Sequence, residues 1–408
     1  MSTNKPPAFA ALRHAGYRPY FTTTALAMMG DNIEHVISYW VLFEKFQSPA
    51  LGGIAVLTHW LPFLFFSVYT GGLADRFDSR RIIQVAQVLF LGVSVAWGVL
   101  FLTDSLQMWH AVVLLSIHGF AGVLWGPASQ VLIHDIVGRE HLQSAVRLNA
   151  TARNLGVLLG PAVGGALMLL LGPAYGILFN AVFFLPVIFW MGRTHHGAPK
   201  ADRVKPPRRG AGLGEAIAIF RQISGNPTLV SMILLAGISS LLVGNAFMAQ
   251  MPEYAHDLGT EKADFSYTML LAANAGGALM AGILLESMGY LTARPRTAII
   301  LTILWCFAIA GFALTDSYPI AVALMFVAGF LNLSFSAMAQ TLVQLQAPDA
   351  LRGRLIGLYN MASNGLRSFS GISVGIVGVF IGIHWSLALA ALLLLAATIA
   401  LLAFTTRR

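Results

Sequence analysis

Ionisable side chains stand inside long apolar stretches of this sequence, where a charge is costly unless it faces a cavity or a partner. Asp31, Glu34 and His35 lie in the first stretch, at spacings that place all three on one face of a helix. This arrangement predicts that Asp31 and Glu34 titrate protons. Arg153, in the fifth stretch, is expected to be the counter-charge that keeps one carboxylate ionised in one conformation. A static buried pair of Asp31 with Arg153 is the structural alternative.

Other polar side chains lie at a similar depth. His59 and His118 fall in the second and fourth stretches, and we expect each to hydrogen-bond a neighbouring helix. Arg367 lies well inside the eleventh stretch, with Asn364 and Asn360 one and two helical turns before it. These three residues extend the candidate central cavity into the second half of the chain.

The composition shows which solvent surrounds these stretches. Of 408 residues, 57% are hydrophobic and only 10% are charged, whereas soluble domains carry roughly 25% charged residues. Such a chain needs lipid around it, which argues against a soluble enzyme or a disordered protein. The net charge is +8, and most of the basic residues lie in short segments between apolar stretches. This distribution favours anionic lipid over nucleic acid as the partner of the basic residues. A single cysteine, Cys306, excludes intrachain disulfides and cysteine-based metal clusters.

Twelve stretches approach the roughly 20 apolar residues that a helical membrane crossing needs. They are residues 20–43, 52–73, 81–102, 108–132, 143–171, 174–192, 227–251, 265–286, 297–314, 319–345, 354–383 and 385–405.

The basic residues between the stretches predict the orientation. Most of the 25 Lys and Arg residues fall on the side that carries both termini, whereas Lys45 and Lys262 fall on the other side. Positively charged loops stay in the cytoplasm, so both termini are expected to be cytoplasmic.

The longest connection predicts the domain organisation. We expect an N-terminal six-helix half at 1–192, a cytoplasmic linker at 193–226 and a C-terminal six-helix half at 227–408. A Gly-x-Leu-x-acid pattern ends both the second and the eighth stretch, at Asp75 and Glu286. This recurrence indicates that the halves are repeats, a common plan for transporters with a site between two halves.

The second stretch ends in a motif that resembles a loop signature of the major facilitator superfamily. Its matching residues are Gly71, Gly72, Asp75, Arg76, Arg80 and Arg81, while Asp78 stands where the signature has glycine. The resemblance implies a gating role, in which Asp75 braces this loop against the N-terminal end of the eleventh span. Attraction between a carboxylate and the positive end of a helix favours that contact.

The fifth stretch resembles the antiporter motif found chiefly in exporters of this superfamily. Its residues are Gly156, Gly160, Pro161, Gly164 and Gly165. Glycines allow close helix packing and a proline bends a helix, so ordinary packing is the alternative interpretation. Together with Gly126-Pro127-Ala128 and Leu351-Arg352-Gly353-Arg354, the motifs resemble the macrolide-efflux and enterobactin-exporter branch. One departure is the absence, around residues 115–119, of the span-four arginine that many proton-coupled drug antiporters carry.

Gly30-Asp31 followed by His35 also resembles the first span of ferroportin, where such side chains bind divalent metal. Carboxylate oxygen and imidazole nitrogen are plausible ligands for a transition metal. Metal export, with Asp31 and His35 as ligands, is therefore the alternative function.

These observations and resemblances imply an all-α membrane protein with the major facilitator fold, made of twelve transmembrane helices in two pseudo-symmetric six-helix halves. The expected function is secondary export of an amphipathic small molecule, a drug or a siderophore, across the bacterial inner membrane and driven by proton influx. A non-transporting scaffold or receptor is a further alternative. The sequence has no Walker motif for ATP hydrolysis, and no enzyme activity, cofactor or nucleic-acid partner is expected. The chain is expected to be a monomer, in contact with substrate, protons and lipid.

Overall fold

The computed structural model describes residues 8–46, 49–195, 213–244, 247, 251–258, 263–288, 293–371, 374 and 377–406. Within these ranges the regular structure is helical and contains no strand. Seven helical segments of the described residues are long and apolar enough to cross a membrane, judged by length and composition alone. Large apolar side chains such as Leu169 and Phe380, 88% and 81% exposed, cover the outside, as lipid contact requires.

The first bundle contains the helices that precede residue 195. They are η1 (Ala10–Arg13), α1 (Tyr17–Phe46), α2 (Pro49–Arg76), α3 (Ser79–Leu102), α4 (Met108–Val137), α5 (Leu142–Asn180), η2 (Ala181–Phe184) and α6 (Leu185–Arg193).

The stretch from α5 to α6 is two crossings rather than one. Gly172 has φ 75° and ψ 163°, which lie outside the helical region and which a residue without Cβ adopts readily. A Cβ placed on Gly176 would lie 3.3 Å from the carbonyl of Leu167, so the chain folds back on itself at this point. The predicted break between the fifth and sixth spans is therefore present, and it occurs at Gly172.

The second bundle contains the helices that follow residue 212. They are α7 (Leu213–Gln222), α8 (Pro227–Leu242), α10 (Met251–Asp257), α11 (Ala263–Met288), α12 (Pro295–Leu314), α13 (Tyr318–Gln346), η3 (Asp349–Leu351), α14 (Arg352–Asn360), η4 (Met361–Gly365), α15 (Arg367–Gly371), α16 (Val377–Ile381) and α17 (Ile383–Thr406).

Two predicted spans of this bundle are not regular α-helices throughout their described residues. The span predicted at 227–251 ends as a helix at Leu242, because Gly244 adopts a left-handed φ of 46°. The span predicted at 354–383 changes to π-helix at Met361–Gly365, where the Leu366 N–H donates to the carbonyl of Met361. Such π segments are rare and often lie at functional sites.

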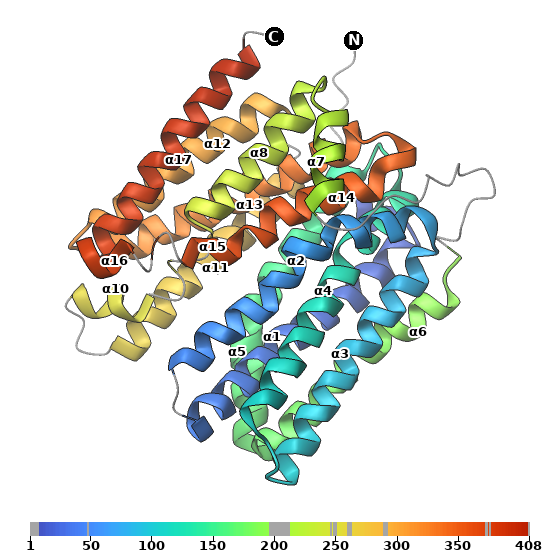
Figure 1. Ribbon diagram of the computed structural model, residues 1–408, viewed down its shortest axis with the longest axis vertical. Helices are drawn as coiled ribbons and strands as arrows, with labels where there is room; N and C mark the ends of the chain where they lie inside the picture. The colour runs from blue at the N-terminus through green and yellow to red at the C-terminus, as the bar shows by residue number, and fades with distance from the viewer. Residues whose placement is uncertain are drawn as a thin grey trace.

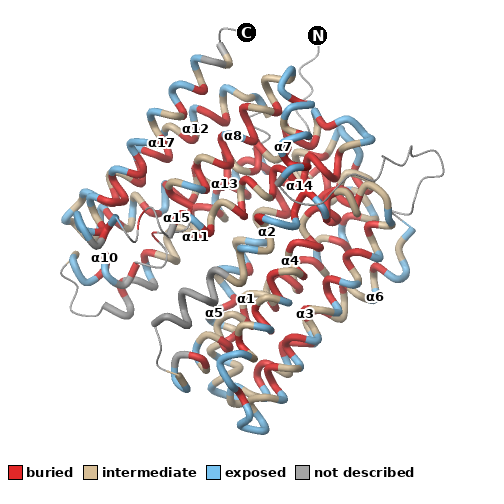
Figure 2. Tube along the Cα trace, viewed as in Figure 1, coloured by how far each residue is buried: buried red, intermediate tan, exposed pale blue. Residues whose placement is uncertain are grey.

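The two bundles lie side by side with their long axes roughly parallel, and both termini emerge at the same end (Figure 1). We call this the termini end and the other the far end. Buried residues line the interior of both bundles (Figure 2), and a few residues of α11, α13 and α14 belong to the main core cluster of the first bundle. The two bundles meet mainly where α14 lies along α2 and where α11 lies along α5.

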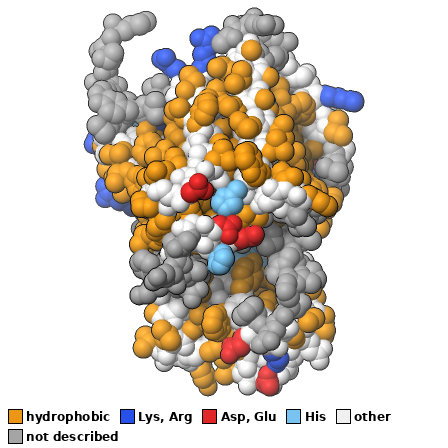
Figure 3. Space-filling model, turned by 90° about the vertical axis from the view of Figure 1, so that its left-hand side faces the viewer, with side chains coloured by type: hydrophobic (Ala, Val, Ile, Leu, Met, Phe, Trp, Pro, Cys, Tyr) orange, Lys and Arg blue, Asp and Glu red, His pale blue; other side chains and the backbone are white. Residues whose placement is uncertain are grey.

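Charged side chains lie mostly at the two ends of the molecule. Figure 3 shows most of the Lys and Arg side chains of the face in view toward the termini end, hydrophobic side chains over much of the rest, and a group of acidic and His side chains near its middle. At the far end, Lys45 Nζ lies 2.6 Å from Asp104 Oδ1 and joins the end of α1 to the turn after α3. The hydrogen bond from Lys45 keeps the pKa of the Asp104 carboxyl below its ordinary value.

Candidate transport site and gate

His118 of α4 binds two carboxylates of α1. Its Nε2 lies 2.7 Å from Asp31 Oδ1, and its Nδ1 lies 2.7 Å from Glu34 Oε1. The side chains of His118 and Glu34 are almost fully buried, at 1% and 2% exposed, whereas 29% of the Asp31 side chain is exposed. Asp31 is therefore the more accessible of the two carboxylates.

This trio, Asp31–His118–Glu34, must hold at least two protons to keep both hydrogen bonds. An ionised carboxylate only accepts, so two ionised carboxylates require both nitrogens of His118 to carry a hydrogen. Removing one proton leaves a ring nitrogen facing a carboxylate with no hydrogen between them, and that contact becomes repulsive. The packing of α1 against α4 is thus sensitive to the protonation state of the trio.

Polar neighbours support the buried carboxylate. The Ser94 hydroxyl of α3 donates to Glu34 Oε2, and the Asn180 amide donates to Ser94 Oγ at 3.2 Å. Gly30 on α1 packs against Phe183, Phe184 and Asn180, where a Cβ would lie 3.0–3.3 Å from its neighbours.

Two more histidines continue the polar network. His35 Nδ1 donates to the main-chain carbonyl of Asp31 at 2.7 Å, which leaves Nε2 as an acceptor 3.3 Å from His59 Nδ1. The rings of His35 and His118 meet edge to face, with their centroids 4.7 Å apart. The centroids of the His59 and Trp60 rings are 4.6 Å apart. The network therefore extends from α4 through α1 to α2.

The histidines are also close enough to share a metal ion. One nitrogen of each of His35, His59 and His118 lies within 4.8 Å of the others. Both nitrogens of His118 are engaged with carboxylates, however. In the predicted ligand pair, His35 hydrogen-bonds the main-chain carbonyl of Asp31 and not its carboxylate.

The arginines lie nearby but not in the predicted pair. The group bonded to the Asp31 carboxylate is His118, and Arg153 lies only within electrostatic range of Asp31. The static Asp31–Arg153 pair, which was the structural alternative, is therefore not formed in this conformation, and the role of Arg153 as a counter-charge stays a prediction. Arg367 lies with its guanidinium carbon 4.9 Å from the Trp60 ring centroid. Asn364 is buried in the π segment of the same span.

Asp75 has the contact that the sequence predicts for it. Its Oδ1 accepts from the Gly353 N–H at 2.5 Å, and its Oδ2 accepts from the Arg354 N–H at 3.0 Å. These N–H groups belong to the first turn of α14, where the helix itself supplies no acceptor and where it attracts negative charge. Gly71 makes the approach possible, because a Cβ there would lie 2.1 Å from the carbonyl oxygen of Gly353.

The pseudo-symmetric position, Glu286 at the end of α11, makes a corresponding contact with α5. The Ser144 hydroxyl, in the first turn of α5, donates to Glu286 Oε1, and Arg147 Nη1 donates to the carbonyl of Leu285 at 2.9 Å. The N-terminal segment covers this contact, since the Ala11 N–H donates to Ser144 Oγ at 2.9 Å. Both acid-to-helix contacts lie at the termini end and hold the bundles together there.

The remaining residues of the gating motif stabilise the turn between α2 and α3. Asp78 caps α3 by accepting from the Arg80 N–H, and the Arg80 guanidinium binds Asp78 at 2.6 Å and the carbonyl of Thr194. Arg81 donates to Gln84 at 2.9 Å, and Gly72 faces Arg354. Arg76 is partly buried at the end of α2.

Polar side chains form a layer between the gate and the trio. Gln130 of α4 accepts from Gln344 of α13 at 3.1 Å and donates to Asn360 of α14 at 3.2 Å. The pairs join the two bundles, and all three side chains are buried. This layer separates the central polar network from the termini end.

The antiporter motif is a ridge of α5 that packs on α1. A Cβ would lie 3.0 Å from the Met28 carbonyl at Gly156, 2.5 Å from Asn32 Cβ at Gly160 and 3.4 Å from Val36 at Gly164. A Cβ at Gly165 would meet nothing within 4 Å, and the side chain of Pro161 lies outside the described residues. The ridge fixes α1, the helix that carries Asp31 and Glu34.

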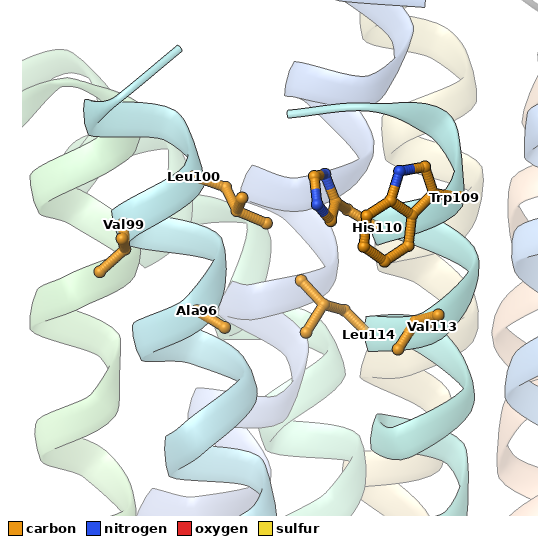
Figure 4. A pocket seen from close by; sticks show the side chains of 7 residues that line it. All are labelled: Ala96, Val99, Leu100, Trp109, His110, Val113 and Leu114. Atoms are coloured by element: carbon orange, nitrogen blue, oxygen red, sulfur yellow. The ribbon is translucent and has the colours of Figure 1, made fainter. Parts of the chain in front are cut away.

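An apolar groove of about 360 Å³ lies elsewhere, between α3 and α4 near the far end (Figure 4). Its lining residues are Ala96, Val99, Leu100, Trp109, His110, Val113 and Leu114. This lining comes from one bundle and contains no acidic residue, so it lacks the features of the central network.

His118 was the functional residue that sequence reasoning undervalued. The expectation of a hydrogen bond to a neighbouring helix is confirmed, but the partners are two carboxylates. The signal available in the sequence was its depth in the fourth stretch, equal to that of Asp31 in the first.

Comparisons with known proteins agree with this architecture. The family model described as transmembrane secretion effector matches residues 6–408. Enterobactin exporter EntS of Shigella boydii is 29% identical over 306 residues, which cover 72% of this chain and 69% of the relative. Enterobactin exporter EntS of Escherichia coli is 28% identical over the same shares.

Solved transporter structures show the same fold. The human organic anion transporter MFSD10 superposes with a TM-score of 0.73 at 14% identity, over 94% of this chain and 99% of that one. The E. coli fucose:proton symporter FucP gives a TM-score of 0.70 at 12% identity, over 94% and 98%. The predicted fold class is confirmed. The chain belongs to the transmembrane secretion effector family of the major facilitator superfamily.

Proposed function

We propose that this chain is a secondary active exporter that moves an amphipathic small molecule out of the cell in exchange for protons. Family membership makes it a multi-pass membrane transporter rather than an enzyme. The similarity to enterobactin exporters supports a siderophore or a drug-like compound as the substrate.

The observation that carries proton coupling is the trio Asp31–His118–Glu34. It needs at least two protons to keep its two 2.7 Å contacts, and it lies midway along α1 and α4. Loss of a proton would weaken the contact between these helices. Protons would therefore bind more tightly to the conformation in which the contact is formed, and a driving ion must distinguish conformations in this way. Arg153, in electrostatic range of Asp31, is the group that would favour the ionised form.

The gate contacts support alternating access between two halves. We propose that residues 1–192 and 227–408 are the moving halves and that 193–226 is the linker. Asp75 and Glu286 close the termini end in the conformation described here. Opening at this end requires both acid-to-helix contacts to break.

The proposal includes an orientation in the bacterial inner membrane with both termini cytoplasmic and a monomeric chain. Exposed positions at the two ends allow a test: His195 at the termini end and Ser105 at the far end. In a Cys306→Ser background, an impermeant maleimide added to whole cells should label Ser105→Cys and leave His195→Cys unlabelled. The reverse pattern would invert the proposed topology.

The main experiment is export in inside-out vesicles with an imposed pH gradient. The test compounds are enterobactin, named in the relatives' description, and erythromycin as an amphipathic drug. The pH gradient should drive accumulation with wild type and with Asp316→Asn, whose carboxylate is exposed between α12 and α13, but not with Asp31→Asn. Equal accumulation by Asp31→Asn and wild type would remove the proposed coupling residue, and no gradient-driven movement of any compound would favour a scaffold or receptor.

Metal export is the second candidate, because the three histidines approach one another within 4.8 Å. Calorimetry with Co²⁺ and Zn²⁺ on wild type, His35→Ala and His59→Ala tests it. Saturable binding that both variants lose would favour metal export. Without such binding, the small-molecule proposal stands.

A further inference from the structure

Two arginines in the membrane interior come from different bundles. Arg153 belongs to α5, and Arg367 begins α15 just after the π segment. They lie within electrostatic range of one another, and the Arg153 side chain is exposed. Guanidinium groups stay protonated in proteins, so two positive charges share the central space between the bundles.

The charges around this space do not balance. Asp31 and Glu34 supply two negative charges, and the doubly hydrogen-bonded imidazolium of His118 offsets one of them. Arg153 and Arg367 add two positive charges, whereas the sequence has no Asp or Glu in the last four apolar stretches, 297–314 to 385–405. An excess positive charge in a membrane interior is costly and therefore favours the binding of an anion.

Aromatic rings lie beside the same charges. The guanidinium of Arg367 lies over the Trp60 ring at 4.9 Å, and Trp60 packs against Phe63 at 5.5 Å. Tyr359 lies within electrostatic range of both arginines, and its hydroxyl donates to the Ser336 carbonyl at 3.2 Å. Flat apolar surface therefore adjoins two planar cations that bind carboxylates through paired hydrogen bonds.

We propose, on the basis of the export function above, that Arg153 and Arg367 form the substrate site and that the substrate is an aromatic organic anion. Its acidic group lies between the two guanidinium groups, and its ring packs against Trp60. Such a ligand places a negative charge between two like charges held by opposite bundles, so it reduces their repulsion and its binding draws the bundles together. A neutral compound of the same shape lacks this effect.

Binding of 1-naphthoate and 1-naphthamide tests the proposal, because the two probes share a ring system and differ in charge. Calorimetry is performed on the full chain in lipid nanodiscs for wild type, Arg153→Gln, Arg367→Gln and the control Arg221→Gln on the exposed face of α7. Wild type and the control should bind naphthoate at least about tenfold more tightly than naphthamide. This is the difference in affinity expected when a ligand lacks one charge-assisted hydrogen bond. Each central variant should lose most of this preference, and Arg153→Lys should retain part of it.

The proposal is overturned if wild type binds both probes equally, binds neither, or if the central variants weaken both probes alike. Thermal unfolding of each variant separates loss of the site from loss of the fold. Gradient-driven export of enterobactin or erythromycin without any preference for naphthoate would refute only the anion site. Absence of gradient-driven export would instead refute the proposed function.

Discussion

His118 Nε2 lies 2.7 Å from Asp31 Oδ1, although 87 positions separate the two residues in the sequence. The contact joins α4 to α1 through an imidazole ring, which can carry a hydrogen on one or on both of its nitrogens. Because Glu34 occupies the other ring nitrogen, His118 cannot lose a proton without weakening one of its two contacts. This relationship is the centre of the proposed coupling between protons and conformation.

The gate should open when the charge on Asp75 is removed. Asp75→Asn replaces a carboxylate that accepts two N–H groups of α14, and hydrogen bonds to charged groups contribute about 1.5–3 kcal/mol. We expect the termini end to open more often. Spin labels are attached at Phe77→Cys and Ala350→Cys in a Cys306→Ser background. The distance between them, measured by double electron–electron resonance, should be longer in Asp75→Asn than in wild type.

Asp78→Asn is the control for the gate, because Asp78 lies in the same turn but caps α3 instead of α14. Its label distances should match those of wild type. Identical distances in Asp75→Asn and Asp78→Asn would show that Asp75 does not hold the gate.

The glycine ridge of α5 gives a stability prediction. Gly160→Ala places a methyl group 2.5 Å from Asn32 Cβ, and overpacking of this kind costs about 1–3 kcal/mol. The variant should unfold at a lower temperature than wild type in lipid nanodiscs, whereas Gly165→Ala, with nothing within 4 Å, should not. Equal unfolding temperatures for the two variants would mean that the ridge does not determine how closely α5 and α1 pack.

The short helix α7 should be held against the gate by one ion pair. Glu215 Oε1 lies 3.3 Å from Arg354 Nε, and both side chains are buried. Removing one partner of a buried pair costs about 3–5 kcal/mol. Hydrogen exchange at residues 213–222 should therefore be faster in Glu215→Gln and unchanged in Arg221→Gln. Unchanged exchange in Glu215→Gln would show that apolar contacts alone hold α7.

Much of this site follows from local spacing in the sequence. Asp31, Glu34 and His35 share a helical face whatever surrounds it, and the acidic residue of a motif at a helix end predicts the Asp75 contact. The identity of the partner does not follow, because the alignment of α4 against α1 decides that His118, rather than Arg153, meets Asp31.

The interrupted spans show the same limit. Apolar content predicts a crossing at 354–383 but not the π segment at Met361–Gly365. That segment itself packs closely on α2, since a Cβ at Gly365 would lie 2.7 Å from Leu64 Cα. The local winding of a helix therefore depends on a neighbour that is distant in sequence.

The most direct test of the coupling is the proton movement itself. Proteoliposomes containing a trapped pH dye, with the membrane potential clamped by K⁺ and valinomycin, are given enterobactin or erythromycin on one side. Wild type and His195→Gln, whose histidine is exposed outside the network, should move protons in the direction opposite to the compound. Asp31→Asn and His118→Gln should bind the compound without moving protons. Substrate-dependent proton movement of wild-type size in His118→Gln would contradict the account.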